Sequence, residues 1–272
     1  MALRINYNLA SSSAQRGLGA SQDAYAKQAN RLSTGLRINS ASDDAAGMAV
    51  SEKLKNQVRG LNQAERNAQD GISLLQTAEG GLSEIHSILG RMRELTVQAA
   101  NDTLATADRA NINAEFTQLT AEVTRLANAV EFNGKKLINA TANGPIVLQI
   151  GANNGDTLSL ALTNNTATGL SLTGDVTSQA NAASALTNVD AAIATVSTNR
   201  ANLGAMQNRL ESVGRSLAVA SENTAAANSR VADADIAESM SELVRSQILQ
   251  QAGISVLAQA NQAPSLVLQL LR

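Results

Sequence analysis

The sequence contains no cysteine and no tryptophan, and only two prolines, Pro145 and Pro264, occur among its 272 residues. Without cysteine the chain can form neither a disulfide nor a thiolate metal site. Aromatic residues make up 1% of the sequence, whereas a compact globular core usually draws on large aromatic side chains. Long stretches without proline allow helices to continue for many turns. The apolar residues are mostly Ala, Leu, Val and Ile, which favours long helices packed side by side.

The groups that catalysis needs are also scarce. His86 is the single histidine, and we interpret it as a surface residue of a long helix. The carboxylate pairs Asp43-Asp44 and Asp233/Asp235 each precede a predicted helix, so helix capping is favoured over metal binding or acid–base chemistry. The net charge is -2 with both signs interspersed, which argues against nucleic acid as a partner. We therefore predict no catalytic, metal or cofactor site, and no enzyme.

Apolar residues recur in alternating steps of three and four along much of the chain, which is the pattern of the seam of a supercoiled helix. The first seam lies within a helix predicted over 44–100, the second spans 112–130 and the third begins after residue 182. Their members are Val58, Leu61, Ala64, Ala68, Ile72, Leu75, Ala78, Leu82, Ile85, Leu89, Met92, Leu95 and Ala99; Ile112, Phe116, Leu119, Val123, Leu126 and Val130; and Leu186, Val189, Ile193, Val196, Arg200, Leu203, Met206, Leu210, Val213, Leu217 and Ala220. Arg200 is the one polar member. We interpret it as fixing the register between helices or as extending its charged end into solvent. The three seams predict a long helical bundle.

The middle of the chain has a different pattern. Two runs of apolar residues alternate with other residues: Ile146, Leu148 and Ile150, and Leu158, Leu160 and Leu162. A segment rich in turn residues, 152–156, lies between the two runs. This pattern is typical of a β-hairpin. We predict a turn at 132–136 and a small β-hairpin element with polar loops at about 134–176.

Both ends carry apolar stripes. Near the start, Leu18, Tyr25 and Leu32 repeat every seven residues. Near the finish lie two offset stripes and an apolar tail: Ile236, Met240 and Leu243 with Ile254 and Leu257; Val244, Ile248, Ala252 and Val256; and Leu266, Val267, Leu268, Leu270 and Leu271. A helix with two apolar faces cannot hide both against one partner, and exposed apolar surface usually marks an interface. We expect the two terminal helices to pair with each other and also to contact neighbouring subunits.

The first residues lack the charged start and unbroken apolar run of a secretory signal. No stretch approaches the length of a membrane span. These features alone predict a cytoplasmic protein, unless export uses an uncleaved signal of another kind.

Several long motifs, in order, carry a resemblance to a known family. They are Arg31–Gly47, Arg66–Ser73, Arg93–Asn101, Phe132–Gly134, Gln149–Asn153, Asp233–Asp235, Gln247–Gly253, Val256–Gln262 and Leu270–Arg272. Together they resemble bacterial flagellins over about residues 1–155 and 185–272, in a short form without the variable outer domains.

The resemblance implies a subunit that polymerises into the flagellar filament and serves motility. Residues 1–42 and 230–272 would form an inner core domain, a coiled coil of the terminal helices, and residues 43–229 an outer helical domain with the hairpin element. It also implies export by the flagellar secretion apparatus without a cleaved signal peptide, which replaces the cytoplasmic prediction. The partners implied are further copies of the chain, a secretion chaperone on the C-terminal helix, and the flagellar cap and junction proteins.

Some flagellins are detected by a Toll-like innate immune receptor, and the resemblance maps the contact residues to Arg91, Leu95 and Glu115. Gly90 stands where family members usually carry Gln. The alternative interpretation is that Leu95 is a seam residue while Arg91 and Glu115 are surface charges needed for assembly.

Two further functions compete with a filament subunit. A hook–filament junction protein shares similar terminal helices and would form a short collar, although both sets of terminal motifs favour a flagellin. A protease inserted in a flagellin scaffold would need a metal motif in its central region, which has neither His nor Cys.

Overall fold

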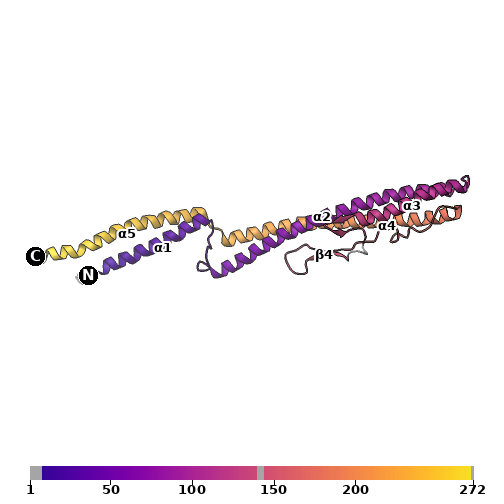
Figure 1. The fold of residues 1–272 in the computed structure, drawn as a ribbon. Helices are drawn as coiled ribbons and strands as arrows, with labels where there is room; N and C mark the ends of the chain where they lie inside the picture. The colour runs from indigo at the N-terminus through magenta and orange to yellow at the C-terminus, as the bar shows by residue number, and fades with distance from the viewer. Residues whose placement is uncertain (1–7, 140–143, 271–272) are drawn as a thin grey trace. The chain divides into compact units, whose positions relative to one another are not determined.

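The computed structural model describes residues 8–139 and 144–270, with side chains as far as Gln262. Its elements, drawn in Figure 1, are α1 (Leu9–Thr34), α2 (Ala45–Ala99), α3 (Thr106–Ala129), β1 (Glu131–Phe132), β2 (Lys135–Lys136), β3 (Ile146–Gln149), β4 (Thr157–Leu160), α4 (Gln179–Ala232) and α5 (Ile236–Leu270). The chain forms two compact units, a terminal unit within residues 1–56 and 223–272 and a central unit of residues 57–222. The mainly α fold with a small strand region confirms the predicted fold class.

Aspartates start two of the long helices, as predicted. The Asp44 carboxylate accepts a hydrogen bond from the backbone N–H of Gly47 at 2.8 Å, at the first turn of α2. Asp235 accepts from the N–H groups of Ala237 and Glu238, at 2.8 and 3.2 Å, at the first turn of α5. Both side chains satisfy N–H groups that a helix leaves unpaired at its start. The capping interpretation is therefore confirmed for Asp44 and Asp235, whereas Asp43 accepts hydrogen bonds from N–H groups of the loop before α2.

The core of the central unit follows the predicted seams. Residues from Leu75 to Ala99 at seam positions of α2 are buried, as are Ile112, Phe116 and Val123 of α3 and Val189 and Val196 of α4. Leu74 and Ala127, which the seam spacing omits, are buried as well. In Figure 1 the three helices lie side by side along this unit. The core is continuous because each helix presents its seam to the other two.

Two short antiparallel pairs make up the strand region. In the first, Phe132 pairs with Lys135, and the intervening Asn133 and Gly134 have φ of 49° and 77°. Positive φ at both central residues is the backbone of a type I′ turn, for which Asn-Gly is the preferred sequence. In the second, Ile146 pairs with Leu160 and Gln149 with Thr157. The strands thus end at Leu160, and the predicted hairpin element continues to residue 176 without further strand.

Arg200, the polar member of the third seam, forms an ion pair between helices. Its guanidinium donates to Glu79 of α2 at 2.6 Å. Both side chains are partly exposed, so the pair lies at the edge of the seam. This contact ties α4 to α2 at one relative position, consistent with a role in register.

Within the described part of the chain, no helix combines the length and the apolar content that crossing a membrane requires.

Candidate self-association surface

The terminal unit is built on an antiparallel pair of helices, α1 and α5, which lie side by side in Figure 1. At one end, Asn8 Nδ2 donates to the carbonyl of Ala260 at 2.8 Å and Ser11 donates to Asn261 at 2.8 Å. At the other end, Ala234 N–H donates to the carbonyl of Gly35 at 2.9 Å. Polar contacts therefore fix the register of the pair at both ends, and the predicted pairing of the terminal helices is confirmed.

The turn after α1 depends on backbone geometry that glycine supplies. Gly35 has φ of 71° and its N–H donates to the carbonyl of Arg31 at 2.8 Å, which ends the helix in the left-handed conformation. The chain then forms a bridge between Leu36 and Asp233. The N–H of Arg37 donates to the carbonyl of Ala232 at 2.7 Å and its guanidinium to that of Val231 at 2.6 Å. This turn joins both chain segments just before α5 begins.

The contact between the two helices follows a heptad seam that is only partly apolar. Buried or half-buried residues recur at alternating steps of three and four along α1, and likewise along α5. They are Ser11, Ala14, Leu18, Ser21, Tyr25, Gln28 and Leu32, and Ser239, Leu243, Ser246, Gln250, Gly253, Leu257 and Ala260. None of the α1 members is fully buried, and the only fully buried members of α5 are Ser239 and Ser246. The pair is therefore held by a seam with little apolar area.

The apolar residues of α5 lie largely on its outer surface. Ile236, Met240, Val244, Ile248, Ala252 and Val256 follow one another at steps of four, and all are exposed. A row at steps of four forms a continuous ridge along a helix. We call these six residues the outer ridge. Ile248 has 60% of its surface exposed and Val256 54%, so the ridge is open to a partner.

The two predicted apolar stripes of α5 do not coincide with its contact face. Leu243 and Leu257 of the first stripe face α1, while Ile236, Met240 and Ile254 are exposed. The seam runs through serine and glutamine because the inward face is set by the spacing and by the end contacts rather than by hydrophobicity. Among the residues named for polymerisation, Leu18, Tyr25 and Leu32 lie in the seam, whereas Ile248, Ile254 and Val256 are exposed. Leu271 and the side chains of Leu266, Leu268 and Leu270 lie outside the described residues.

An acidic side chain anchors the loop between α1 and α2. Asp43 forms an ion pair with Lys27 at 2.8 Å. It also accepts hydrogen bonds from the N–H groups of Asn39 and Ser40 at 3.3 and 3.2 Å. The Lys27 ammonium, together with these N–H groups, lowers the pKa of Asp43 well below its usual range. The charged form of Asp43 thus holds the loop onto α1.

The residues named for receptor contact split into two environments. Arg91 and Glu115 are exposed and joined at 2.9 Å, and Arg91 also reaches Glu94 at 3.1 Å. The carboxylates of Glu115 and then Glu94 raise the pKa of Arg91. Leu95 is only 1% exposed and belongs to the core. The structure therefore brings the two charges together on the surface of α2 and α3, and it places Leu95 beneath them.

Sequence reasoning missed a buried polar network in the central unit. Asn165 is fully buried and donates to the carbonyl of Ile138 at 3.3 Å and to the hydroxyl of Thr163 at 3.0 Å. Asn199 of α4 donates to the Asn165 side chain at 2.7 Å. No local spacing predicts this network, since its members are brought together only by the tertiary fold. It fixes the segment after β4 against α4.

The described residues contain no group of three or more His, Cys, Asp or Glu side chains that could hold a metal ion. His86 is half-buried rather than freely solvated, and within the described part of the chain its buried Nδ1 has no hydrogen-bond partner.

Comparison with known proteins gives consistent matches over nearly the whole chain. The family model of the bacterial flagellin N-terminal helical region matches residues 5–143, and that of the bacterial flagellin C-terminal helical region matches residues 186–271. A flagellin from Halalkalibacterium halodurans is 49% identical over 98% of this chain and 99% of its own length. A flagellin from Bacillus subtilis is 45% identical over 99% of this chain and 100% of its own.

A solved structure adds a similarity in three dimensions. The crystal structure of Bacillus cereus flagellin superimposes with a TM-score of 0.51 and 32% identity, covering 56% of this chain and 88% of that one.

Proposed function

Since the chain belongs to the bacterial flagellin family, a family of structural subunits of the flagellar filament, we propose that it joins its neighbours through the outer ridge of α5. Membership of this family makes the protein a structural component of the flagellum rather than an enzyme. The observation that carries the proposal is the row of exposed apolar residues at Ile236, Met240, Val244, Ile248, Ala252 and Val256.

The energetic argument rests on where apolar surface is left in the terminal unit. Burying an exposed Val or Ile side chain stabilises an assembly by about 1.5–3 kcal/mol. The helix pair places its own leucines, such as Leu18, Leu243 and Leu257, in its contact, whereas the six ridge residues lie outside that contact and remain available to another copy. Regular steps of four carry the ridge along α5 from Ile236 to Val256, which suits an extended helix–helix contact. We propose that residues 1–42 and 230–272 form the inner, polymerising domain and residues 43–229 the outer one.

Filament growth follows from the kind of contact. A ridge on α5 that packs against a different surface of the next subunit makes a heterologous interface, and such an interface gives an open helix when its rotation does not close. The apolar tail, Leu266, Leu268, Leu270 and Leu271, extends the ridge in sequence. We assign it to the same assembly contact.

The ridge also bears on the route to the flagellum. An apolar helix face that is open before assembly needs protection from non-specific association. We propose that a secretion chaperone covers α5 until export through the flagellar secretion apparatus, without a cleaved signal, and that the cap and junction proteins receive the same surface at the filament ends.

Electron microscopy of seeded monomer tests the assembly surface. The double variant Val244→Gln/Ile248→Gln should fail to form long filaments, and so should a truncation ending at Gln262. A matched control, Gln247→Ala/Gln251→Ala, changes exposed polar residues of the same helix and should assemble like the parent. Unchanged filaments from the ridge variant, with the parent's helix content, would refute the proposal.

The same experiment separates the junction-protein alternative. A hook–filament junction protein would stop at short rings or collars even when filament seeds are supplied. Long filaments from the parent chain exclude that alternative.

A second proposal concerns recognition by a Toll-like innate immune receptor. The adjacent, exposed charges of Arg91 and Glu115 support a polar contact there, while Leu95 would act by holding α2 in place. Arg91→Ala should abolish signalling in a receptor reporter assay, and Arg93→Ala, which removes a nearby exposed arginine, is the control. Equal signalling from both variants and the parent would refute the contact.

A further inference from the structure

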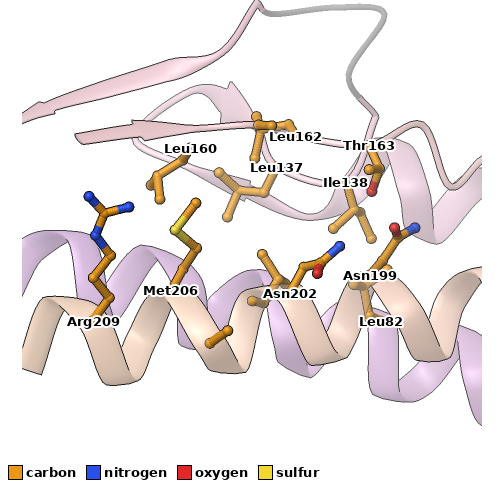
Figure 2. Close-up of a pocket in the computed structure, with 13 residues that line it drawn as sticks. Leu82, Leu137, Ile138, Leu160, Leu162, Thr163, Asn199, Asn202, Met206 and Arg209 are labelled. Atoms are coloured by element: carbon orange, nitrogen blue, oxygen red, sulfur yellow. The ribbon is translucent and has the colours of Figure 1, made fainter.

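The central unit contains an apolar groove that assembly through α5 does not use. It has a volume of about 400 Å³ and lies between α4 and the segments on either side of the β3–β4 pair. In Figure 2, Asn199, Asn202 and Met206 stand on α4, and Leu137, Leu160 and Leu162 face them from the strand side. Leu82 of α2 also lines the groove. This volume falls within the range of small-molecule sites, about 300–1,000 Å³.

One wall of the groove follows α4. This wall runs from Asn199 through Leu203 and Met206 to Arg209, positions that share one face of the helix. The ten residue steps from Asn199 to Arg209 correspond to about 15 Å along the helix axis. A linear molecule can therefore lie along this wall.

The two ends of the groove differ in polarity. At one end the amide of Asn199 donates to Asn165, which in turn donates to Thr163, so these donors are already used within the protein. At the other end, Figure 2 shows the Arg209 side chain extending from α4 toward the level of Leu160. Arg209 is exposed, and no carboxylate of the described residues forms an ion pair with it. The groove thus offers an unpaired cation at one end and apolar walls along its length.

We propose that this groove binds a single-chain anionic amphiphile, a linear alkyl carboxylate. Its carboxylate pairs with the Arg209 guanidinium, a geometry that guanidinium groups favour. Its alkyl chain lies along the half-buried side chains of Met206, Leu203 and Leu162. Beneath them Leu137, Leu160 and Leu82, each at most 2% exposed, close the floor of the groove. An extended peptide fits less well, because its amide groups would be left without partners against these apolar walls. This inference does not depend on the proposed assembly surface.

Isothermal titration of the full-length monomer with sodium decanoate, below its micelle concentration, tests the site. The parent should bind one decanoate per chain. Arg209→Gln should weaken binding by about two- to fivefold, the effect of an exposed ion pair. Arg215→Gln, which changes another exposed arginine of α4 outside the groove, is the matched control and should leave binding unchanged. Decanol should bind the parent and Arg209→Gln equally.

Two further variants locate the bound chain. Asn202→Phe fills the groove from an exposed position and should reduce binding more than tenfold. Val244→Gln/Ile248→Gln, on the outer ridge, should bind decanoate normally. Loss of binding in the ridge variant alone would overturn the proposal in favour of adsorption to α5.

A spectroscopic measurement avoids dependence on any variant. Decanoate should shift the methyl NMR signal of Met206 in the parent protein, with saturation at the affinity found by titration. An unperturbed Met206 signal in the presence of bound decanoate would overturn the site, and so would equal affinities of Arg209→Gln and Arg215→Gln.

Discussion

In the central unit, Leu82, Ile85, Leu89 and Met92 of α2 are at most 1% exposed, whereas α1 in the terminal unit buries no residue fully. Both regions follow alternating steps of three and four, so the spacing is the same and the side chains differ. Large aliphatic residues in the α2 seam give a dense core among three helices. Serine, glutamine and glycine in the α1–α5 seam give a pair that is defined in register but has little apolar area. The same helical periodicity thus produces a self-sufficient bundle in one unit and an incomplete one in the other.

The largest expected difference comes from truncating one leucine in each region. Leu89→Ala removes a fully buried side chain and should lower the free energy of unfolding by about 2–5 kcal/mol, which corresponds to a fall in Tm of about 10 °C. Leu18→Ala removes a half-buried one and should have an effect of about 1 kcal/mol. Thermal unfolding followed by circular dichroism measures both. Equal losses would mean that the two contacts are equally dense.

Two glycines allow the two units to be compared by the space that is free beside a helix rather than by the apolar area that is buried. A Cβ at Gly81 of α2 would lie 2.6 Å from Val130 Cγ2 and 3.2 Å from Ile138 Cδ1, and valine is stiff at χ1. A Cβ at Gly253 of α5 would meet Leu18 at an ordinary 3.5 Å.

Gly81→Ala should therefore destabilise the protein by about 1–3 kcal/mol through overpacking. Gly253→Ala should stabilise α5 by about 1 kcal/mol, because alanine favours the helix. Urea unfolding midpoints would distinguish them, and a stabilising Gly81→Ala would contradict the close contact.

The serines of the α5 seam provide a second stabilising change, of about half that size per residue. Ser239→Ala/Ser246→Ala should increase stability by about 1 kcal/mol in total, since alanine has the higher helix propensity and the seam loses little polar contact. Amide hydrogen exchange along α5 should slow. Faster exchange in the double variant would show that the two hydroxyls are needed to hold the pair.

The smallest effect is a dependence on pH at the loop after α1. Because the pKa of Asp43 is lowered on folding, its contribution to stability is present above its unfolded pKa of about 3.9 and is lost as the pH falls through the folded value. Acidification should release the N–H groups of Asn39 and Ser40, which NMR shifts would report. Asp43→Asn should remove this transition, while Asp23→Asn should retain it. A transition that persists in Asp43→Asn would assign it to another group.

Much of the fold could be predicted from the sequence because its seams are long and repetitive. Leu61 through Ala99 marked the buried face of α2, and Asp44 and Asp235 marked helix starts, since both signals are local. The inward face of α5 could not be predicted from apolar residues, because Ser239 and Ser246 are buried while Ile236 and Met240 are exposed. Alternating steps of three and four residues, counted without regard to polarity, would have identified this inward face.

The sites were less predictable than the helices. The groove depends on Leu137, Leu160 and Met206, which come from different segments and meet only in the fold. Leu95 was named both as a seam residue and as a receptor contact, and only its burial separates the two roles. Interfaces with other molecules are hard to predict from this sequence, because its helices already require apolar residues at regular intervals for their own packing.

The antiparallel pairing of α1 and α5 has a consequence for engineering. The contact between Asn8 and Ala260 brings the start of α1 beside the later turns of α5, whereas the non-strand segment 161–178 belongs to the central unit. Cargo attached beside Asn8 or Ala260 would therefore crowd the same helix pair. A guest sequence inserted near the exposed Thr173–Gly174 segment, where Gly174 has φ of 117°, leaves this helix pair untouched and makes the subunit a scaffold for repeated display.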